Sequence, residues 1–219
     1  MRIKKAATLF LFVLLSFSAG CELPMRLRYQ FDPPQPGEVL VSDDFSDPDS
    51  WDIWSDELSV VDFNSGGLRF FVNEPNFDFW SRLKQDFKDA VIQVDATKVG
   101  GPDDNSFGVF CRYENRDNFY YFLASSDGYF GIMKVLDGSH SLISSEQLQY
   151  NEVIQKGDRS TNHIQAECSG PNLVLTVNDV RLAVAYDTDL EWGGVGLMVG
   201  TYDEIGVDIL FDNFQVTQP

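Results

Sequence analysis

Residues 107–136, FGVFCRYENRDNFYYFLASSDGYFGIMKVL, decide the fold class of this chain. Three short segments, Phe107–Tyr113, Asn118–Ser125 and Tyr129–Leu136, are rich in aromatic and β-branched residues, which favour strands. An Asn-Arg-Asp triplet and a Ser-Asp-Gly triplet separate them, and both are typical of turns. We therefore predict three consecutive antiparallel strands joined by short turns.

The same strand pattern extends over the rest of the chain. Further segments with strand character are Val39–Phe45, Ser59–Phe63, Leu68–Val72, Ala90–Ala96, Asn162–Cys168, Leu173–Val177, Arg181–Tyr186, Gly194–Thr201 and Val207–Val216. Hairpin turns are indicated at Asn64–Gly67 and at Asn178–Asp179. Asn151–Gly157 fits one helical turn that ends at the glycine. Many short strands without a long helix predict an all-β, two-sheet antiparallel sandwich.

The N-terminus has the pattern of an export signal. Basic residues at positions 2, 4 and 5 precede an apolar run, 6–17, that is too short to span a hydrocarbon core of about 30 Å. The closing Ser-Ala-Gly-Cys, residues 18–21, resembles the lipobox of bacterial lipoproteins, in which the cysteine is acylated and becomes the first mature residue. The alternative is an ordinary secretory signal with an unrelated cysteine.

These features predict a signal peptide at 1–20, a lipidated tether at 21–38 and a folded domain at 39–219. The proline-rich stretch 32–37 favours an extended, poorly packing segment within the tether. Acylation of Cys21, for example by palmitate, implies a membrane anchor. The protein would then be displayed in the cell envelope, outside the cytoplasm.

The cysteine count is consistent with this location. If Cys21 carries lipid, one pair remains, Cys111 and Cys168, and an oxidising compartment favours a disulfide over two free thiols. Within their strands both cysteines share the side of the apolar residues, so both are expected to point into the core. We predict a Cys111–Cys168 bridge inside the sandwich.

The charge of the chain argues against one class of partner. It carries 34 acidic and 16 basic residues, with a formal net charge of −18. Nucleic-acid affinity depends on Lys and Arg neutralising phosphates, so an acidic chain is expected to be repelled by nucleic acid.

Three motifs resemble a known kind of module. The opening DDFSDP (43–48), the central DNFYYFLASSDGYFGI (117–132) and the closing VDILFDNFQV (207–216) are similar to LamG-like domains of the concanavalin A-like lectin/glucanase superfamily. Bacterial lipoproteins with such domains are often described as family 16 glycoside hydrolase-like or 3-keto-disaccharide hydrolase-like. The resemblance implies a jelly roll whose first and last strands are neighbours. It also implies a function in carbohydrate binding or hydrolysis.

Catalytic motifs are missing from the sequence. Family 16 hydrolases place two carboxylates on one strand in a Glu-x-Asp-x-x-Glu pattern, which does not occur here. His140 and His163 are the only histidines, and neither lies in a known catalytic motif. We predict no catalytic residues and no cofactor, and we expect glycan binding without catalysis. Alternatives are a hydrolase or lyase with an unrecognised carboxylate pair, and an adhesive or structural envelope module.

A candidate binding face follows from the strand alternation. Sugar rings stack on aromatic faces and need polar groups around them. If Cys111 points inward, its neighbours point outward, and the outward set of the central strands is expected to line a concave sheet with residues of a neighbouring strand. Trp80, with Ser81 and Arg82 beside it, is a separate candidate platform. The predicted ligand-binding residues are Trp80, Gln93, Asp95, Phe110, Arg112, Asn118, Tyr120 and Lys134. The same pattern fits a face covered by loops, in which the aromatics form a second small core.

A structural calcium ion is a further prediction. Asp44 near the first strand and Asp212 in the last would be neighbours if these strands pair. Ca²⁺ prefers oxygen ligands of this kind. The alternative is ordinary solvated acids at the strand ends.

Overall fold

The computed structural model describes residues 33–47 and 49–219. The predicted signal peptide and Cys21 lie outside the described residues, so both stay predictions. Pro34–Pro219 forms one compact unit. No helix in this described part of the chain is long and apolar enough to cross a membrane.

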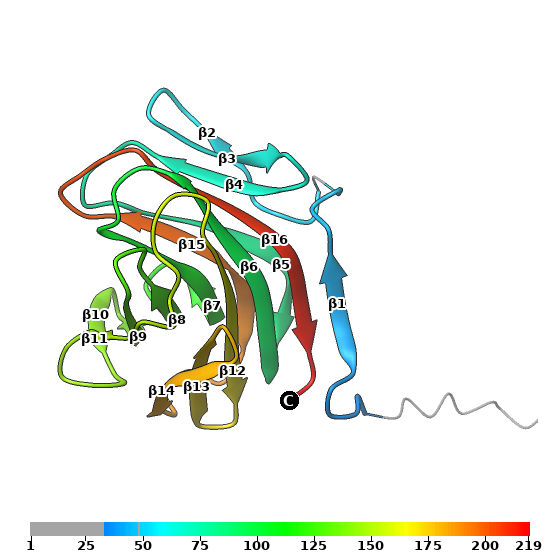
Figure 1. Ribbon diagram of the computed structural model, residues 1–219. Helices are drawn as coiled ribbons and strands as arrows, with labels where there is room; N and C mark the ends of the chain where they lie inside the picture. Colours follow the sequence, from blue (N-terminus) through cyan, green and yellow to red (C-terminus); the bar gives the residue numbers. More distant parts are fainter. Residues whose placement is uncertain (1–32, 48) are drawn as a thin grey trace, which may run out of the picture. The chain divides into compact units, whose positions relative to one another are not determined.

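The described chain is an all-β sandwich of two antiparallel sheets, as predicted (Figure 1). Nine strands form the larger sheet. In spatial order they are β14 (Val180–Tyr186), β13 (Asn172–Val177), β12 (Thr161–Ser169), β6 (Ala90–Gly100), β16 (Val207–Thr217), β4 (Gly67–Val72), β3 (Ser59–Asn64) and β2 (Trp54–Ser55), and β1 (Val39–Asp43) also pairs with β16.

Seven strands form the second sheet, which carries the residues discussed below. Their spatial order is β10 (Ser139–Leu142), β9 (Tyr129–Leu136), β8 (Asn118–Ala124), β7 (Asn105–Asn115), β15 (Gly193–Thr201) and β5 (Asp78–Phe87), and β11 (Gln149–Tyr150) pairs with β9. The three strands expected from residues 107–136 are therefore consecutive neighbours, β7, β8 and β9.

The first and last strands lie side by side, as the jelly-roll resemblance implied (Figure 1). Val41 pairs with Val216, and Asp43 pairs with Phe214. The pairing continues just before β1, where Gly37 donates to the Gln218 carbonyl over 2.8 Å. Gly37, which the prediction assigned to the tether, therefore takes part in backbone hydrogen bonding with the end of the chain.

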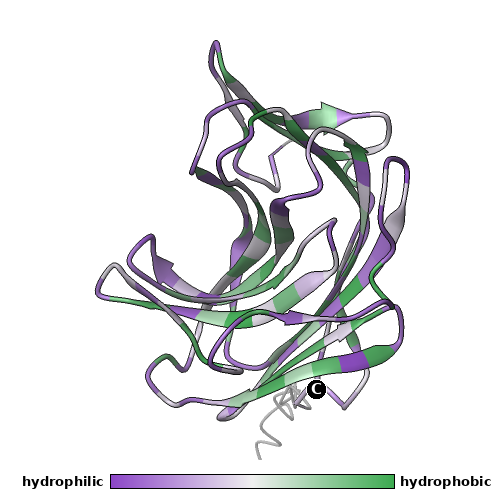
Figure 2. Cartoon of the chain, turned by 60° about the vertical axis from the view of Figure 1, so that its left-hand side comes forward, coloured by the Kyte–Doolittle hydropathy of each residue, from purple (hydrophilic) through white to green (hydrophobic). Residues whose placement is uncertain are grey.

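Apolar side chains of both sheets meet in one large core. Alternate residues of most of the longer strands belong to it, for example Val109 of β7, Phe122 of β8 and Phe211 of β16, all fully buried. Polar and apolar residues alternate along many strands, and polar residues gather in the loops (Figure 2). Burial of large aromatic side chains is the main source of stability in such a sandwich.

A second apolar cluster covers the other face of the seven-stranded sheet. It consists of Phe110, Phe119, Tyr121, Leu123, Val135 and Met198. We call this the outer face, because it is turned away from the nine-stranded sheet. A second small core was the alternative reading of the predicted binding face, but of the eight predicted ligand-binding residues only Phe110 belongs to this cluster.

The predicted bridge joins the two sheets. Cys111 of β7 and Cys168 of β12 form a disulfide, and both are buried in the main core. The two residues are 57 positions apart in sequence.

Local predictions succeeded at the tight turns. Asn178 and Asp179 both have positive φ, 49° and 66°, as a two-residue hairpin with primed geometry requires. The segment at 151–157 forms turns rather than the predicted helical turn.

The strand β5 was not predicted. Its side chains form the central part of the candidate site described below.

Candidate functional site

Three side chains of β5 point to the outer face in a row. Asp78, Trp80 and Arg82 are two residues apart, so they share one side of the strand. Trp80 pairs with Met198, which belongs to the outer cluster. The Trp80 residue is 37% exposed, and its ring centre lies 6.3 Å from that of Phe119. A carboxylate, an indole and a guanidinium therefore follow one another along an accessible strand.

Glycines of the neighbouring strand β15 make room for this row. A Cβ atom at Gly200 would overlap Asp78 Oδ1 and Ser106 Oγ. A Cβ atom at Gly196 would overlap the Phe110 ring. Because Gly196 and Gly200 have no side chain, side chains of the adjacent strands lie across β15 at these two positions. The outer face is therefore recessed along β15.

Connected depressions run over the outer face. A pocket of about 510 Å³ at Trp80 shares Asp78 with a pocket of about 230 Å³ that is lined by Tyr121. The latter shares Tyr202 and Leu148 with a third pocket, of about 410 Å³. We call these three connected pockets the outer groove. Its Trp80 end is aromatic, and Asp104 and Asp127 line its other end.

Asp78 joins the first two pockets and lacks a partner. No hydrogen bond to its carboxylate is found among the described residues. Burial raises the pKa of Asp78, and the nearby His140 acts in the opposite direction. His140 lies at the rim, with Nδ1 3.3 Å from the Tyr121 hydroxyl. A partly desolvated carboxylate without a donor is ready to accept hydrogen bonds from a ligand.

Two of the eight predicted ligand-binding residues lie on the outer face. Trp80 is accessible there, while Phe110 is buried in the cluster beneath. The prediction that the seven residues other than Trp80 share one face is wrong. The following paragraphs give the physical reasons for the other six.

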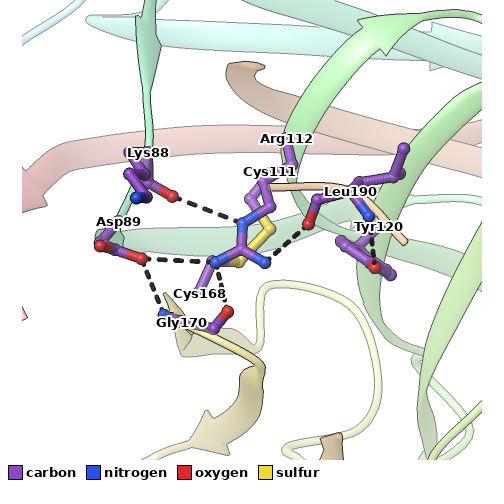
Figure 3. Close-up of a disulfide and its surroundings, with 8 residues drawn as sticks. All are labelled: Lys88, Asp89, Cys111, Arg112, Tyr120, Cys168, Gly170 and Leu190. Atoms are coloured by element: carbon purple, nitrogen blue, oxygen red, sulfur yellow. Dashed lines mark hydrogen bonds and ion pairs between the residues drawn. A yellow bond between two sulfur atoms is a disulfide. The ribbon is translucent and has the colours of Figure 1, made fainter. Parts of the chain in front are cut away.

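Arg112 points away from the outer face, into a corner beside the disulfide (Figure 3). A β-bulge follows Cys111, and the φ of Arg112 is 51°, so the regular alternation of β7 ends at this residue. The guanidinium donates to the carbonyls of Lys88, Gly170 and Leu190 over 3.4, 2.6 and 2.8 Å, and to Asp89 over 3.4 Å. The buried Arg112 thus holds three loops together.

Tyr120 and Lys134 face the main core instead of the outer face. Tyr120 is fully buried, and its hydroxyl donates to Asp187 over 2.5 Å. Lys134 donates to Asp187 and to Asp189, both over 2.6 Å. These hydrogen bonds raise the pKa of Lys134. Together Tyr120 and Lys134 anchor the loop after β14.

Asn118 lies at the β7–β8 turn, where it hydrogen-bonds Asn115 over 3.2 Å.

Gln93 and Asp95 belong to β6, in the opposite sheet. Asp95 accepts hydrogen bonds from Asn213 and contacts His163 Nδ1 at 2.7 Å. Gln93 lines a separate pocket with Asp44. They are therefore not neighbours of the outer groove.

The residues predicted for calcium lie near the paired terminal strands. Asp44 accepts a hydrogen bond from the Ser46 amide, and Asp212 accepts one from the Asn213 amide. No group of three or more His, Cys, Asp or Glu that could hold a metal ion is present among the described residues. The calcium ion stays a prediction.

Sequence reasoning missed Asp78, Tyr121 and Tyr202 as residues of this face. The sequence pattern that could have revealed β5 was the alternation within Asp78–Leu83, in which Phe79, Ser81 and Leu83 point to the side opposite the outer face. This alternation was hard to recognise because the residues on the outer face are a carboxylate, an indole and a guanidinium, which form neither a polar nor an apolar stripe.

Solved structures with a similar fold include a carbohydrate-binding module and a protein of unknown function. The carbohydrate-binding module CBM66 from Bacillus subtilis aligns with a TM-score of 0.62 at 15% identity, covering 77% of this chain and 96% of the module. A Bacillus subtilis protein of unknown function with a galectin-like fold aligns with a TM-score of 0.58 at 10% identity, covering 84% of this chain and 97% of that one.

Part of an enzyme has a similar fold. The xylan β-1,4-xylosidase from Bacillus halodurans C-125 aligns with a TM-score of 0.58 at 12% identity, covering 86% of this chain and 41% of the enzyme. At these identities the likeness shows the jelly-roll fold alone. No family model and no curated protein sequence matches the chain.

Proposed function

We propose that this protein binds carbohydrate in the outer groove and does not transform it. The observation that carries the proposal is the row on β5, where the accessible Trp80 indole stands between the side chains of Asp78 and Arg82. A pyranose ring has an apolar face that stacks on an aromatic ring and a rim of hydroxyls that need donors and acceptors. The β5 row offers all three kinds of contact.

The length of the groove favours an oligosaccharide over a single sugar. The three connected pockets cross several strands, from Trp80 past Asp78 to Tyr202. Aromatic groups occur along this path, with Trp54 and Phe77 at one end and Tyr129 at the other. The carbohydrate-binding module among the similar structures supports this proposal.

Binding is tested by a glycan array with full-length protein in detergent. We expect binding to at least one oligosaccharide. We expect Trp80→Ala to reduce that affinity about tenfold or more, because a central aromatic residue commonly dominates such contacts. The matched control is Trp192→Ala, since Trp192 is 58% exposed and does not line the groove. Equal binding by both variants, or no binding by the wild type, would contradict the proposal.

One observation favours hydrolysis as a second candidate function. Burial raises the pKa of Asp78, as is common for general acids. Product analysis after incubation with any oligosaccharide that binds separates the two functions. Recovery of intact ligand supports binding alone, whereas turnover that is lost in Asp78→Asn supports hydrolysis.

We further propose that the protein is displayed in the cell envelope through acylated Cys21. The support is the sequence pattern of residues 1–21. Metabolic labelling with a palmitate analogue is expected to label the wild type and not Cys21→Ser, and the variant is expected to leave the membrane fraction. Membrane retention of unlabelled Cys21→Ser would refute the anchor.

A further inference from the structure

Arg82 is the exception among the basic residues of this structure. Its Nε is buried without a hydrogen-bond partner, and no ion pair to its side chain is found among the described residues. Every other described Lys or Arg side chain either has such a partner, as Arg69 does with Asp208, or is exposed. Arg82 is therefore the only partly buried cation here that no protein acceptor satisfies.

This lack of a partner is unexpected in so acidic a chain. The chain has 34 acidic residues, which could supply an acceptor for a partly buried guanidinium. A guanidinium that is left without an acceptor costs the folded state free energy. The Arg82 side chain lies across Gly194 of β15, where a Cβ atom would come within 2.9 Å of Arg82 Cδ, and Gly194 pairs with Tyr113 of β7. The guanidinium thus lies over the outer face beside Tyr113, two residues along β5 from the Trp80 platform.

A carboxylate is the group that best satisfies such an arginine. The planar guanidinium binds a carboxylate through two parallel hydrogen bonds, which are stronger than those to a neutral hydroxyl. The buried Nε leaves the terminal nitrogens as the atoms that a ligand reaches. Two residues of a strand span about 7 Å, so a sugar stacked on Trp80 has a neighbour over Arg82.

We propose that Arg82, which lies on β5 next to the Trp80 end of the outer groove without lining its three pockets, makes binding there selective for oligosaccharides in which one sugar is a uronic acid, with its carboxylate on the Arg82 guanidinium. This assignment rests on the proposed function of the groove. A single acidic sugar fits better than a polyanion, because Asp78 lies at the other end of the β5 row and Asp52 and Asp104 line the same groove. These carboxylates repel further negative charges on the ligand.

The test uses matched pairs of oligosaccharides with the full-length protein. Each pair consists of a neutral trisaccharide and the same molecule with one terminal hexose replaced by its hexuronic acid, in the gluco, galacto and manno series. Calorimetric titration of the wild type is expected to give about tenfold tighter binding of the acidic member in at least one series. Arg82→Gln should reduce that ratio to about one, and Arg82→Lys should restore it in part.

The control is Arg181→Gln, which removes the same charge from an exposed position on β14 of the opposite sheet. It should leave the ratio unchanged. Far-UV circular dichroism and thermal melting confirm that each variant is folded. Preference for the neutral member in all series, or an acidic preference that persists in Arg82→Gln, overturns the role of Arg82 while the proposed function stands. If no member of any pair binds although the array shows binding to other glycans, the role of Arg82 falls and the proposed function stands. If the array shows no binding either, both proposals fall.

Discussion

Arg112 and Arg82 belong to the same sheet but differ in what surrounds their guanidinium groups. Arg112, in the corner beside the disulfide, donates four hydrogen bonds to protein acceptors, and it is 2% exposed (Figure 3). Arg82, on the outer face, donates none within the described chain. The comparison teaches that a buried arginine is a sign of function only when the fold leaves it unsatisfied. In the corner the fold satisfies it completely.

The corner is therefore expected to govern stability, and the outer groove to govern binding. The predictions below test this division, from the largest expected effect to the smallest.

Removal of the disulfide should have the largest effect. Cys111→Ser combined with Cys168→Ser opens a link across 57 residues, which should lower the free energy of unfolding by about 4 kcal/mol on the chain-entropy estimate. Chemical denaturation measures this loss. Glycan affinity of the folded fraction should be unchanged, and a loss of affinity at equal folding would show that the corner and the groove are coupled.

Arg112→Met should come next. It leaves three loop carbonyls and Asp89 without their donor, which should cost about 3 kcal/mol of stability. The same denaturation experiment measures it, with exposed Arg159→Met as the matched control. If Arg112→Met lowers the free energy of unfolding by no more than the control does, Arg112 does not stabilise the fold as proposed here.

Tyr120→Phe should have a smaller effect on stability and none on binding. The variant loses the hydrogen bonds to Asp187 and from the Leu190 amide, which should cost about 1.5 kcal/mol. Weaker glycan binding by this variant would contradict its placement in the main core.

Asp78→Asn should change stability least, and in the opposite direction. Because burial raises the pKa of Asp78, the charged form costs the folded state free energy above its folded pKa, and this cost disappears below the unfolded value of 3.8. The variant should therefore be about 1 kcal/mol more stable at pH 7, with no gain in strong acid. Thermal melting across pH measures the difference, and exposed Asp179→Asn provides the control. A gain that does not depend on pH would point to a cause other than the charge.

Sequence reasoning placed the hairpins and the disulfide correctly because local features determine them. The turn at Asn178–Asp179 depends on residues that tolerate positive φ. Cys168 lies in a cleanly alternating strand, so its direction follows from its neighbours.

The orientation of β8 could not be predicted in this way. Its run from Phe119 to Leu123 is apolar on both sides, because the main core and the outer cluster bury opposite faces. Alternation carries no information about direction when both faces are buried. At Arg112 a bulge ended the alternation, and at Lys134 acidic residues of a distant loop made an inward-facing cation favourable.

The sequence by itself determined that this chain forms an all-β sandwich with one internal disulfide, and the resemblance to LamG-like domains implied that the terminal strands pair. Strand periodicity, turn residues and the number of cysteines can be read from the sequence because they do not depend on how the strands pack against one another. Only the tertiary structure decided which arginine is satisfied. The sequence around Arg112 and Arg82 does not show which of them has hydrogen-bond acceptors. The acceptors of a guanidinium come from loops and strands that are far away along the chain.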